Sequence, residues 1–222
     1  MTQRHFAFGV ALVVLTMSTA AVNAQSVSVV NGDIVFTDSA QQTRQLTSAS
    51  SDSEAQLSPD GRWVVFIRKA SGPKIVGPTG DVDPTEVWLI ASDGHGARRL
   101  VKSQGCSRSA TGCNLVAPFN PQFSLDGRYV FFETDCAATT RCVLSVNLKT
   151  GGRRMVSDGS MFKVIRDGRY RGNLVMLKHK YFLCGGSWDW LYVVTPNGVE
   201  VGPIGTDADD LDSALSRCRD VP

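Results

Sequence analysis

The 222-residue sequence predicts an all-β fold built from repeated antiparallel sheets. Two similar segments, residues 58–66 and 124–132, each place an Asp-Gly pair just before an apolar run. Asp-Gly favours a tight hairpin turn, because glycine adopts positive φ without a side-chain clash. Each apolar run lacks polar alternation, so its strand needs cover on both faces. These observations predict hairpins whose sheets pack against one another face to face.

A second hairpin follows each apolar run and completes a unit of four strands. It comprises residues 86–90 and 97–101 in the first unit, and residues 142–146 and 153–156 in the next. The last strand of each unit is polar and rich in arginine. Such a strand suits the solvated outer edge of a sheet, where charged side chains discourage further strand pairing.

Two further stretches extend the repeat. Residues 167–170 are a weaker copy of the turn within a last unit predicted over residues 161–204, and residues 33–47 look like the outer half of another unit. The sequence therefore predicts a small or partial β-propeller of about three and a half four-stranded blades. Closure by the chain alone, an open ring and a ring completed by a second copy are all compatible with this count.

The repeat resembles that of a known family. Residues 121–128 read Pro-Gln-Phe-Ser-Leu-Asp-Gly-Arg, and residues 44–47 read Arg-Gln-Leu-Thr. This pattern resembles the WD-like Ser-Pro-Asp-Gly repeats of TolB-type periplasmic β-propellers and of relatives fused to prolyl peptidases. The likeness covers about residues 33–156 and is specific for fold rather than for function. It implies an exported protein that contacts a protein partner in the cell envelope.

The N-terminal residues predict an export signal. Arg4 precedes an apolar run, and small residues follow up to Ala24. A membrane span needs roughly twenty apolar residues, more than this run supplies, so residues 1–24 are interpreted as a cleaved signal peptide. We expect a periplasmic or secreted protein with no membrane span after cleavage.

The remaining 198 residues (222 minus 24) are expected to form a propeller-like domain, residues 25–204, and a C-terminal tail, residues 205–222. This length is too short for the six blades and the separate N-terminal domain of TolB-type proteins. The tail is predicted to form a short helix, because Thr206 is a good N-cap and the aspartates after it suit the positive end of a helix dipole. We expect its acidic side chains to face the basic residues of the last blade.

All six cysteines lie in the mature part of the chain. An even number of cysteines in an exported chain indicates disulfides. Proximity in sequence favours two of the pairs and leaves the third by elimination, although other pairings are possible. Zinc is disfavoured, because structural zinc sites usually place two ligands two to four residues apart. The favoured pairs are Cys106 with Cys113, Cys136 with Cys142, and Cys184 with Cys218.

No catalytic constellation is recognisable in the sequence. The mature chain has two histidines: His95 lies in a predicted exposed turn, and His179 lies between two lysines on what looks like a solvated strand face. Residues 185–189 do not form a Gly-x-Ser-x-Gly nucleophile elbow, because Asp189 replaces the last glycine. We therefore expect no enzyme, no metal and no cofactor.

An aromatic row is the candidate ligand-binding feature. Trp188, Trp190 and Tyr192 alternate along a predicted strand, so they project from one face. Large aromatic side chains in such a row usually fill the space between sheets, and this interpretation is favoured. The alternative is that the row stacks on sugar rings or a peptide.

These features favour a non-enzymatic exported propeller that acts as a protein-interaction or scaffold module in the cell envelope. The alternative is a glycan- or small-ligand-binding propeller that uses the Trp188/Trp190/Tyr192 face. A homodimer is a further expectation. The formal net charge of +2 is too small for a dedicated nucleic-acid binder.

Overall fold

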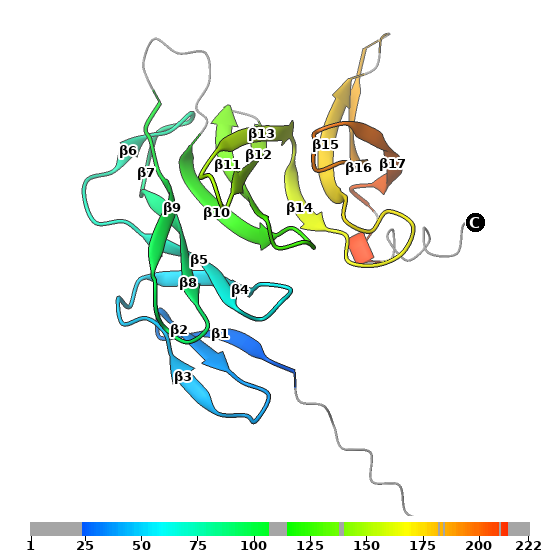
Figure 1. Cartoon of the computed structure of the whole chain (residues 1–222). Coiled ribbons are helices and arrows are strands. Elements are labelled where there is room, and N and C mark those ends of the chain that lie inside the picture. The colour runs from blue at the N-terminus through cyan, green and yellow to red at the C-terminus, as the bar shows by residue number, and fades with distance from the viewer. Residues whose placement is uncertain are drawn as a thin grey trace, which may run out of the picture.

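The computed structural model describes residues 24–106, 115–137, 140–181, 183, 185–208 and 210–212. The predicted signal peptide therefore lies outside the described residues except for Ala24. The described residues form four sheets that follow one another along an arc, with a small two-stranded hairpin beside them (Figure 1). Three sheets have four strands and the first sheet has three. The structure confirms the predicted fold class, an all-β partial propeller.

Strands in each sheet are antiparallel and follow chain order. The first sheet contains β1 (Ser26–Val30), β2 (Asp33–Thr37) and β3 (Thr43–Gln45). The second blade contains β4 (Asp52–Leu57), β5 (Trp63–Lys69), β8 (Thr85–Ala91) and β9 (Arg98–Lys102). The third blade contains β10 (Val116–Phe123), β11 (Tyr129–Ala137), β12 (Thr140–Asn147) and β13 (Arg153–Asp158). The fourth blade contains β14 (Ser160–Val164), β15 (Leu174–Tyr181), β16 (Ser187–Val194) and β17 (Glu200–Thr206). The insertion hairpin contains β6 (Ile75–Val76) and β7 (Asp81–Val82).

The repeated motif forms a locked turn between the first two strands of a blade. Ser58 Oγ donates a hydrogen bond to Asp60 Oδ1 at 2.6 Å and accepts one from the Trp63 N–H at 2.9 Å. Asp60 Oδ2 also pairs with Arg62 Nε at 2.7 Å. The hydrogen bond from Ser58 is the main reason that the pKa of Asp60 is lowered to about 2. The equivalent contacts recur in the third blade, at residues 124–129, with distances of 2.6, 3.0 and 2.6 Å.

The third copy of the motif lacks the serine of this network. Ile165 stands where the other copies have serine, and its side chain is buried in the apolar cluster on the far face of the fourth blade. The turn of this copy is also longer: the Ile165 N–H donates to Asn173 O and the Gly172 N–H donates to Ile165 O, whereas the Ser58 N–H donates to Trp63 O. The weak sequence match of this copy therefore corresponds to a differently built turn.

Consecutive apolar residues of a strand serve different interfaces. In β11, Phe132 packs toward the second blade, whereas Phe131 packs toward the fourth blade. Strands covered on both faces were predicted from their continuous apolar runs. We call the contact of the second and third blades the apolar interface: Val65, Ile67, Val87, Leu89, Val101, Leu115, Phe123, Val130, Phe132, Cys136, Cys142, Leu144 and Val146.

The contact of the third and fourth blades contains buried polar groups, and we call it the mixed interface. Its apolar members are Phe131, Val143, Val156, Phe162, Val164, Leu174, Met176 and Val194. Its buried polar members include Gln122, Glu133, Ser157 and Lys178.

The inner strands of the three complete blades share an irregularity. β4, β10 and β14 each contain a β-bulge where the register with the next strand shifts. A residue with positive φ lies in each bulge: Glu54 (50°), Asn120 (49°) and Met161 (55°). The bulges link neighbouring blades, because the Glu54 carboxylate accepts the Asn120 N–H and the Glu133 carboxylate accepts the Met161 N–H.

The C-terminal end of the arc is covered by side chains from outside the sheet. Tyr170 and Leu211 pack on the far face of the fourth blade. Leu211 and Asp212 are helical, and Asp212 pairs with Lys163 at 2.7 Å. Thr206, the predicted N-cap, is the last residue of β17, and the Asp207 N–H continues the strand pairing by donating to Asp189 O. Within the described residues, no helix is long and apolar enough to cross a membrane.

Candidate functional site: a cavity between three hairpins

A cavity of about 790 Å³ lies where three hairpins from different blades meet. Pro78 and Thr79 of the insertion hairpin, the end of the β11–β12 hairpin and the β15–β16 pair all line it. We call it the hairpin cavity. The lining side chains with functional chemistry are Asp135, Arg141, Asp158, Ser160, His179, Tyr181 and Asp189.

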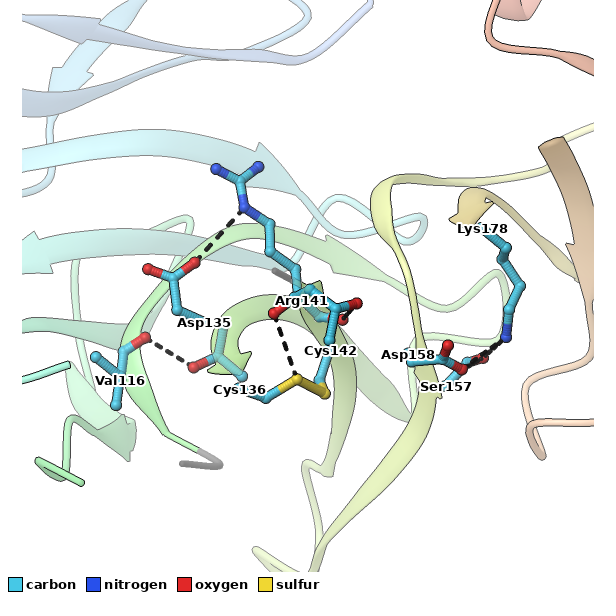
Figure 2. The surroundings of a disulfide bond; sticks show 10 residues. Val116, Asp135, Cys136, Arg141, Cys142, Ser157, Asp158 and Lys178 are labelled. Carbon is cyan, nitrogen blue, oxygen red and sulfur yellow. Dashed lines mark hydrogen bonds and ion pairs between the residues drawn. A yellow bond between two sulfur atoms is a disulfide. The ribbon is translucent and has the colours of Figure 1, made fainter. Parts of the chain in front are cut away.

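A disulfide closes the β11–β12 hairpin at the edge of this cavity. Cys136 and Cys142 are bonded with a Cα–Cα separation of 5.7 Å, which confirms that predicted pair. Asp135 and Arg141 are their immediate neighbours in sequence, and Figure 2 shows both side chains on one side of the hairpin end. The cross-link therefore holds two cavity-lining side chains on a constrained backbone.

The other predicted disulfides extend beyond the described residues. Cys106 is disulfide-bonded. Cys113, Cys184 and Cys218 lie outside the described residues. The pairs of Cys106 with Cys113 and of Cys184 with Cys218 therefore stay predictions.

Arg141 is held by two carboxylates and an aromatic ring. Its Nε lies 3.6 Å from Asp135 Oδ1, and its Nη1 lies 3.9 Å from Glu133 Oε2. The guanidinium lies 4.7 Å from the centre of the Phe119 ring, a cation–π distance. The Arg141 side chain is nevertheless about half exposed, so its remaining N–H groups can donate to a ligand.

His179 and Asp189 form a dyad on the opposite wall. They are direct cross-strand partners in β15 and β16, and His179 Nδ1 lies 2.5 Å from Asp189 Oδ1. With Nδ1–H donated to the carboxylate, a neutral imidazole presents Nε2 as a hydrogen-bond acceptor. Tyr181 packs edge-on against His179 at 4.8 Å and is 80% exposed. His179 is exposed on its strand face, as expected, but Asp189 and Tyr181 hold its ring in place, which the sequence did not suggest.

A buried lysine supports the same wall. Lys178 is 2% exposed and donates hydrogen bonds to Ser157 at 2.7 Å, to Asp158 at 2.8 Å and to Glu200 at 2.7 Å. Figure 2 shows it reaching Ser157 and Asp158. Burial by itself lowers the pKa of Lys178, but its two carboxylate partners outweigh burial and raise it. Burial likewise raises the pKa of Asp158 and of Glu200, yet the contact with Lys178 leaves both pKa values lowered.

The predicted aromatic row does not line the hairpin cavity. Trp188, Trp190 and Tyr192 share the face of β16 that points toward the third blade, whereas Asp189 lies on the other face. Tyr192 packs on the mixed interface, and Lys180 lies over its ring at 4.8 Å. Trp188, at the far end of the row, is 50% exposed. A ligand-binding role of this row stays a prediction.

Sequence reasoning missed the hairpin cavity because its residues come from distant parts of the chain. Asp189 was considered only for the missing nucleophile elbow, and Arg141 was not singled out. A signal was present, since His179 and Asp189 flank a Gly-Gly turn on two strands of one hairpin. Among the residues that the structure describes, no three His, Cys, Asp or Glu side chains group closely enough to hold a metal ion.

Comparisons with protein-family models and with curated proteins find no match. Solved structures do match. An oligogalacturonate lyase from Vibrio parahaemolyticus is 14% identical, with 84% of this chain and 46% of the lyase covered, at a TM-score of 0.49. The β-propeller domain of the Trilobed protease from Pyrococcus furiosus is 10% identical, with 82% and 53% covered, at a TM-score of 0.48. A candidate TolB from Agrobacterium tumefaciens is 12% identical, with 82% and 78% covered, at a TM-score of 0.32.

One of these structures is described as a β-propeller domain, and at these identities and TM-scores the likeness carries no statement about function. The chain spans about half the length of the lyase and of the protease propeller. Membership of the TolB-type repeat family stays a prediction.

One expectation from the sequence is contradicted by these comparisons. The chain was expected not to be an enzyme, but the solved structures that it is similar to include enzymes, among them the oligogalacturonate lyase and a puromycin hydrolase. The small number of histidines misled the sequence reasoning, because a single histidine oriented by a carboxylate is enough for acid–base chemistry. The fold class therefore gives no ground for excluding catalysis, since function depends on the site.

Proposed function

We propose that this chain is an exported β-propeller that binds a short neutral saccharide in the hairpin cavity. The observation that carries the proposal is that each carboxylate lining the cavity has a basic partner, and that an exposed aromatic ring lies beside them. Asp135 pairs with Arg141, Asp158 with Lys178, and Asp189 with His179.

Paired charges favour a neutral ligand with many hydroxyl groups. A free ion entering the cavity has to compete with an existing partner for each charged group. A hydroxyl group, by contrast, can donate to a carboxylate and accept from a guanidinium without separating the pair. Carboxylate oxygens, arginine N–H groups and the hydroxyl of Ser160 offer donors and acceptors on several sides of the cavity.

Tyr181 supplies the apolar contact that a sugar ring needs. Its side chain is 80% exposed although it lines the cavity, and the edge-on contact with His179 supports one side of the ring. An exposed aromatic face beside convergent polar groups is typical of small-ligand sites. The glycan alternative from the sequence is thereby moved from the Trp188 row to Tyr181.

Export is part of the proposal. The N-terminal residues have the order of a signal peptide, and the disulfide of Cys136 with Cys142 is compatible with an oxidising compartment. Secretion of a fusion of residues 1–24 to a reporter enzyme tests this part. Retention of the reporter in the cytoplasm contradicts it.

The binding experiment uses saturation-transfer NMR with maltotriose, cellotriose and chitotriose as probes, and trigalacturonate as the anionic comparison. We expect at least one neutral trisaccharide to bind better than trigalacturonate. Tyr181→Ala should weaken that binding about tenfold or more, because it removes the stacking face. The absence of binding by all three neutral probes contradicts the proposal.

Trp188→Ala is the matched control, because Trp188 is an exposed aromatic residue near the same hairpin end but on the opposite face. We expect it to leave saccharide binding unchanged. Loss of binding in Trp188→Ala with retention in Tyr181→Ala places the ligand on the aromatic row and overturns the assignment to the cavity.

The His179–Asp189 dyad favours a second function at the same site, acid–base chemistry on the bound saccharide. His179 can accept a proton at Nε2, and Asp189 stabilises the resulting imidazolium. Chromatography of the trisaccharides after incubation tests this. Product formation by the natural chain, and its loss in His179→Asn with binding retained, supports catalysis; intact trisaccharides restrict the function toward these probes to binding.

A further inference from the structure

The first sheet lacks the strand that the other three sheets have at their inner edge. An Arg-x-Leu sequence begins in β3, at residues 44–46, and in β9, at residues 98–100. The pair β2–β3 therefore corresponds to the pair β8–β9, which are the last two strands of a blade. β1 is then the counterpart of a second strand such as β5. Among the described residues, β2 is the only strand that pairs with β1. The other edge of β1 is free in this part of the chain.

The turn between β1 and β2 fixes which backbone groups face that free edge. Asn31 and Gly32 both have positive φ, 52° and 79°, as in a two-residue type I′ turn. In such a hairpin the flanking residues, Val30 and Asp33, form a hydrogen-bonded pair, and the pairs then alternate. Val29 and Val27 therefore direct their N–H and C=O groups away from β2. The contacts of Ile34, the partner of Val29, agree: its O accepts the Leu46 N–H and its N–H donates to Thr47 Oγ1.

The β1 edge has no charge, proline or bulge to block strand addition. Its five residues, Ser-Val-Ser-Val-Val, include no charge and no proline, and they pair with β2 without a bulge. Val29 and Val30 are 41% and 48% exposed. Edges of this kind are templates for another strand.

The edges of the three four-stranded sheets are protected. The inner strands β4, β10 and β14 each contain a bulge. The outer strands carry charge or proline: Arg98, Arg99 and Lys102 in β9, Arg153 and Arg154 in β13, and Glu200 and Pro203 in β17.

We propose that β1 is an interaction surface whose occupant is β1 of a second copy of this chain, paired antiparallel about a two-fold axis at Ser28. In this register Val27 of each copy lies opposite Val29 of the other, and these residues exchange the hydrogen bonds that their outward groups can form. The two Ser28 residues face each other in a non-hydrogen-bonded pair.

A second copy fits this edge because the strand is self-complementary. The pairing joins valine to valine and serine to serine, with no like charges opposed. It also covers the exposed valines, and it joins two three-stranded sheets into one of six strands. A closed two-fold contact uses up both edges and leaves none open for further addition.

Analytical ultracentrifugation across the micromolar range tests the proposal with two matched variants. Val29→Pro removes an outward N–H without breaking a bond to β2, and should abolish the dimer. Val29→Thr keeps the N–H and the β-branched shape, and should dimerise like the natural chain. A chain that is monomeric throughout this range, or a dimer that persists in Val29→Pro, overturns the proposal. Circular dichroism melting checks that both variants are folded.

A cross-linking experiment tests the register. Ser28→Cys should form an intermolecular disulfide in mild oxidant, because facing residues of a non-hydrogen-bonded pair lie within disulfide reach. Ser26→Cys is the control, since residue 26 lies opposite residue 30 of the second copy. Equal cross-linking by both variants, or no cross-linking by Ser28→Cys, overturns the proposed pairing.

Discussion

The third blade contacts its two neighbours in different ways. Toward the second blade it presents Phe132, which lies in the apolar interface and has no exposed surface. Toward the fourth blade it presents Phe131, which packs edge-on against Phe162 at 6.4 Å, and next to it Glu133, which is 1% exposed. Adjacent residues of one strand thus serve an interface whose buried cluster is apolar and an interface that also contains buried charge.

The difference teaches how each interface fixes the position of the next blade. Apolar contacts are non-directional and depend on filled volume. Glu133, in contrast, accepts hydrogen bonds from Asn120 Nδ2 at 2.7 Å, from the Met161 N–H at 3.1 Å and from the Phe162 N–H at 3.2 Å. The mixed interface therefore specifies where β14 lies along the third blade, as well as contributing buried area.

The largest expected effect is on the apolar interface. Phe132→Ala should lower the free energy of unfolding by about 3–5 kcal/mol, because it removes a buried ring and leaves a cavity. Urea unfolding measures this loss. The loss should be equal at neutral and at mildly acidic pH, since the contacts that it removes are apolar. A loss that changes strongly with pH contradicts the division between the two interfaces.

Glu133→Gln should have the next largest effect. Glutamine keeps one acceptor oxygen but turns its NH2 group toward backbone N–H groups, so at least one of Met161 N and Phe162 N loses its acceptor. We expect a loss of about 2–3 kcal/mol in urea unfolding. Glu54→Gln is the control, because Glu54 accepts the equivalent N–H from an exposed position and its loss should be much smaller. Equal losses in both variants indicate that burial at the mixed interface does not matter.

Lys178→Met should have the smallest effect, because Asp158 and Glu200 keep some contact with solvent. We expect a loss of about 1–2 kcal/mol at neutral pH. The pH dependence is the sharper readout. The lowered pKa values of Asp158 and Glu200 stabilise the fold above the ordinary carboxyl pKa of about 4 and cease to do so as the pH falls through the lowered values.

The raised pKa of Lys178 acts in the opposite direction. Its contribution is complete below the ordinary lysine pKa of about 10.4 and is lost as the pH rises through the raised value. Urea unfolding from acidic to alkaline pH should therefore show shallower slopes at both ends in Lys178→Met than in the natural chain. Identical profiles contradict the role assigned to Lys178.

The turns and strands could be predicted because their signals are local. Asp60-Gly61 and Asp126-Gly127 specify hairpins by their own conformational preferences, and the apolar runs after them report burial on both faces. The pairing of Cys136 with Cys142 was predicted for the same reason, since the two residues are near neighbours in sequence. The incomplete first sheet was also visible, because residues 33–47 match only the outer half of a unit.

The candidate site could not be predicted in the same way. Thr79, Arg141 and His179 meet from three blades, and no short motif connects them. The left-handed bulge residues Glu54 and Asn120 occupy one repeat position, yet their side chains differ, so the sequence carries no common signature of that bend.

The sequence by itself determined that this protein is a series of antiparallel sheets with apolar residues on both faces, because hairpin turns and strand burial depend on residues that are neighbours in the chain. The tertiary structure alone decided which polar groups lie between the blades and which strand edge is left uncovered. Those outcomes depend on how whole sheets are placed relative to one another, and hydrogen bonds such as that of Glu133 with Met161 join residues that local patterns cannot relate.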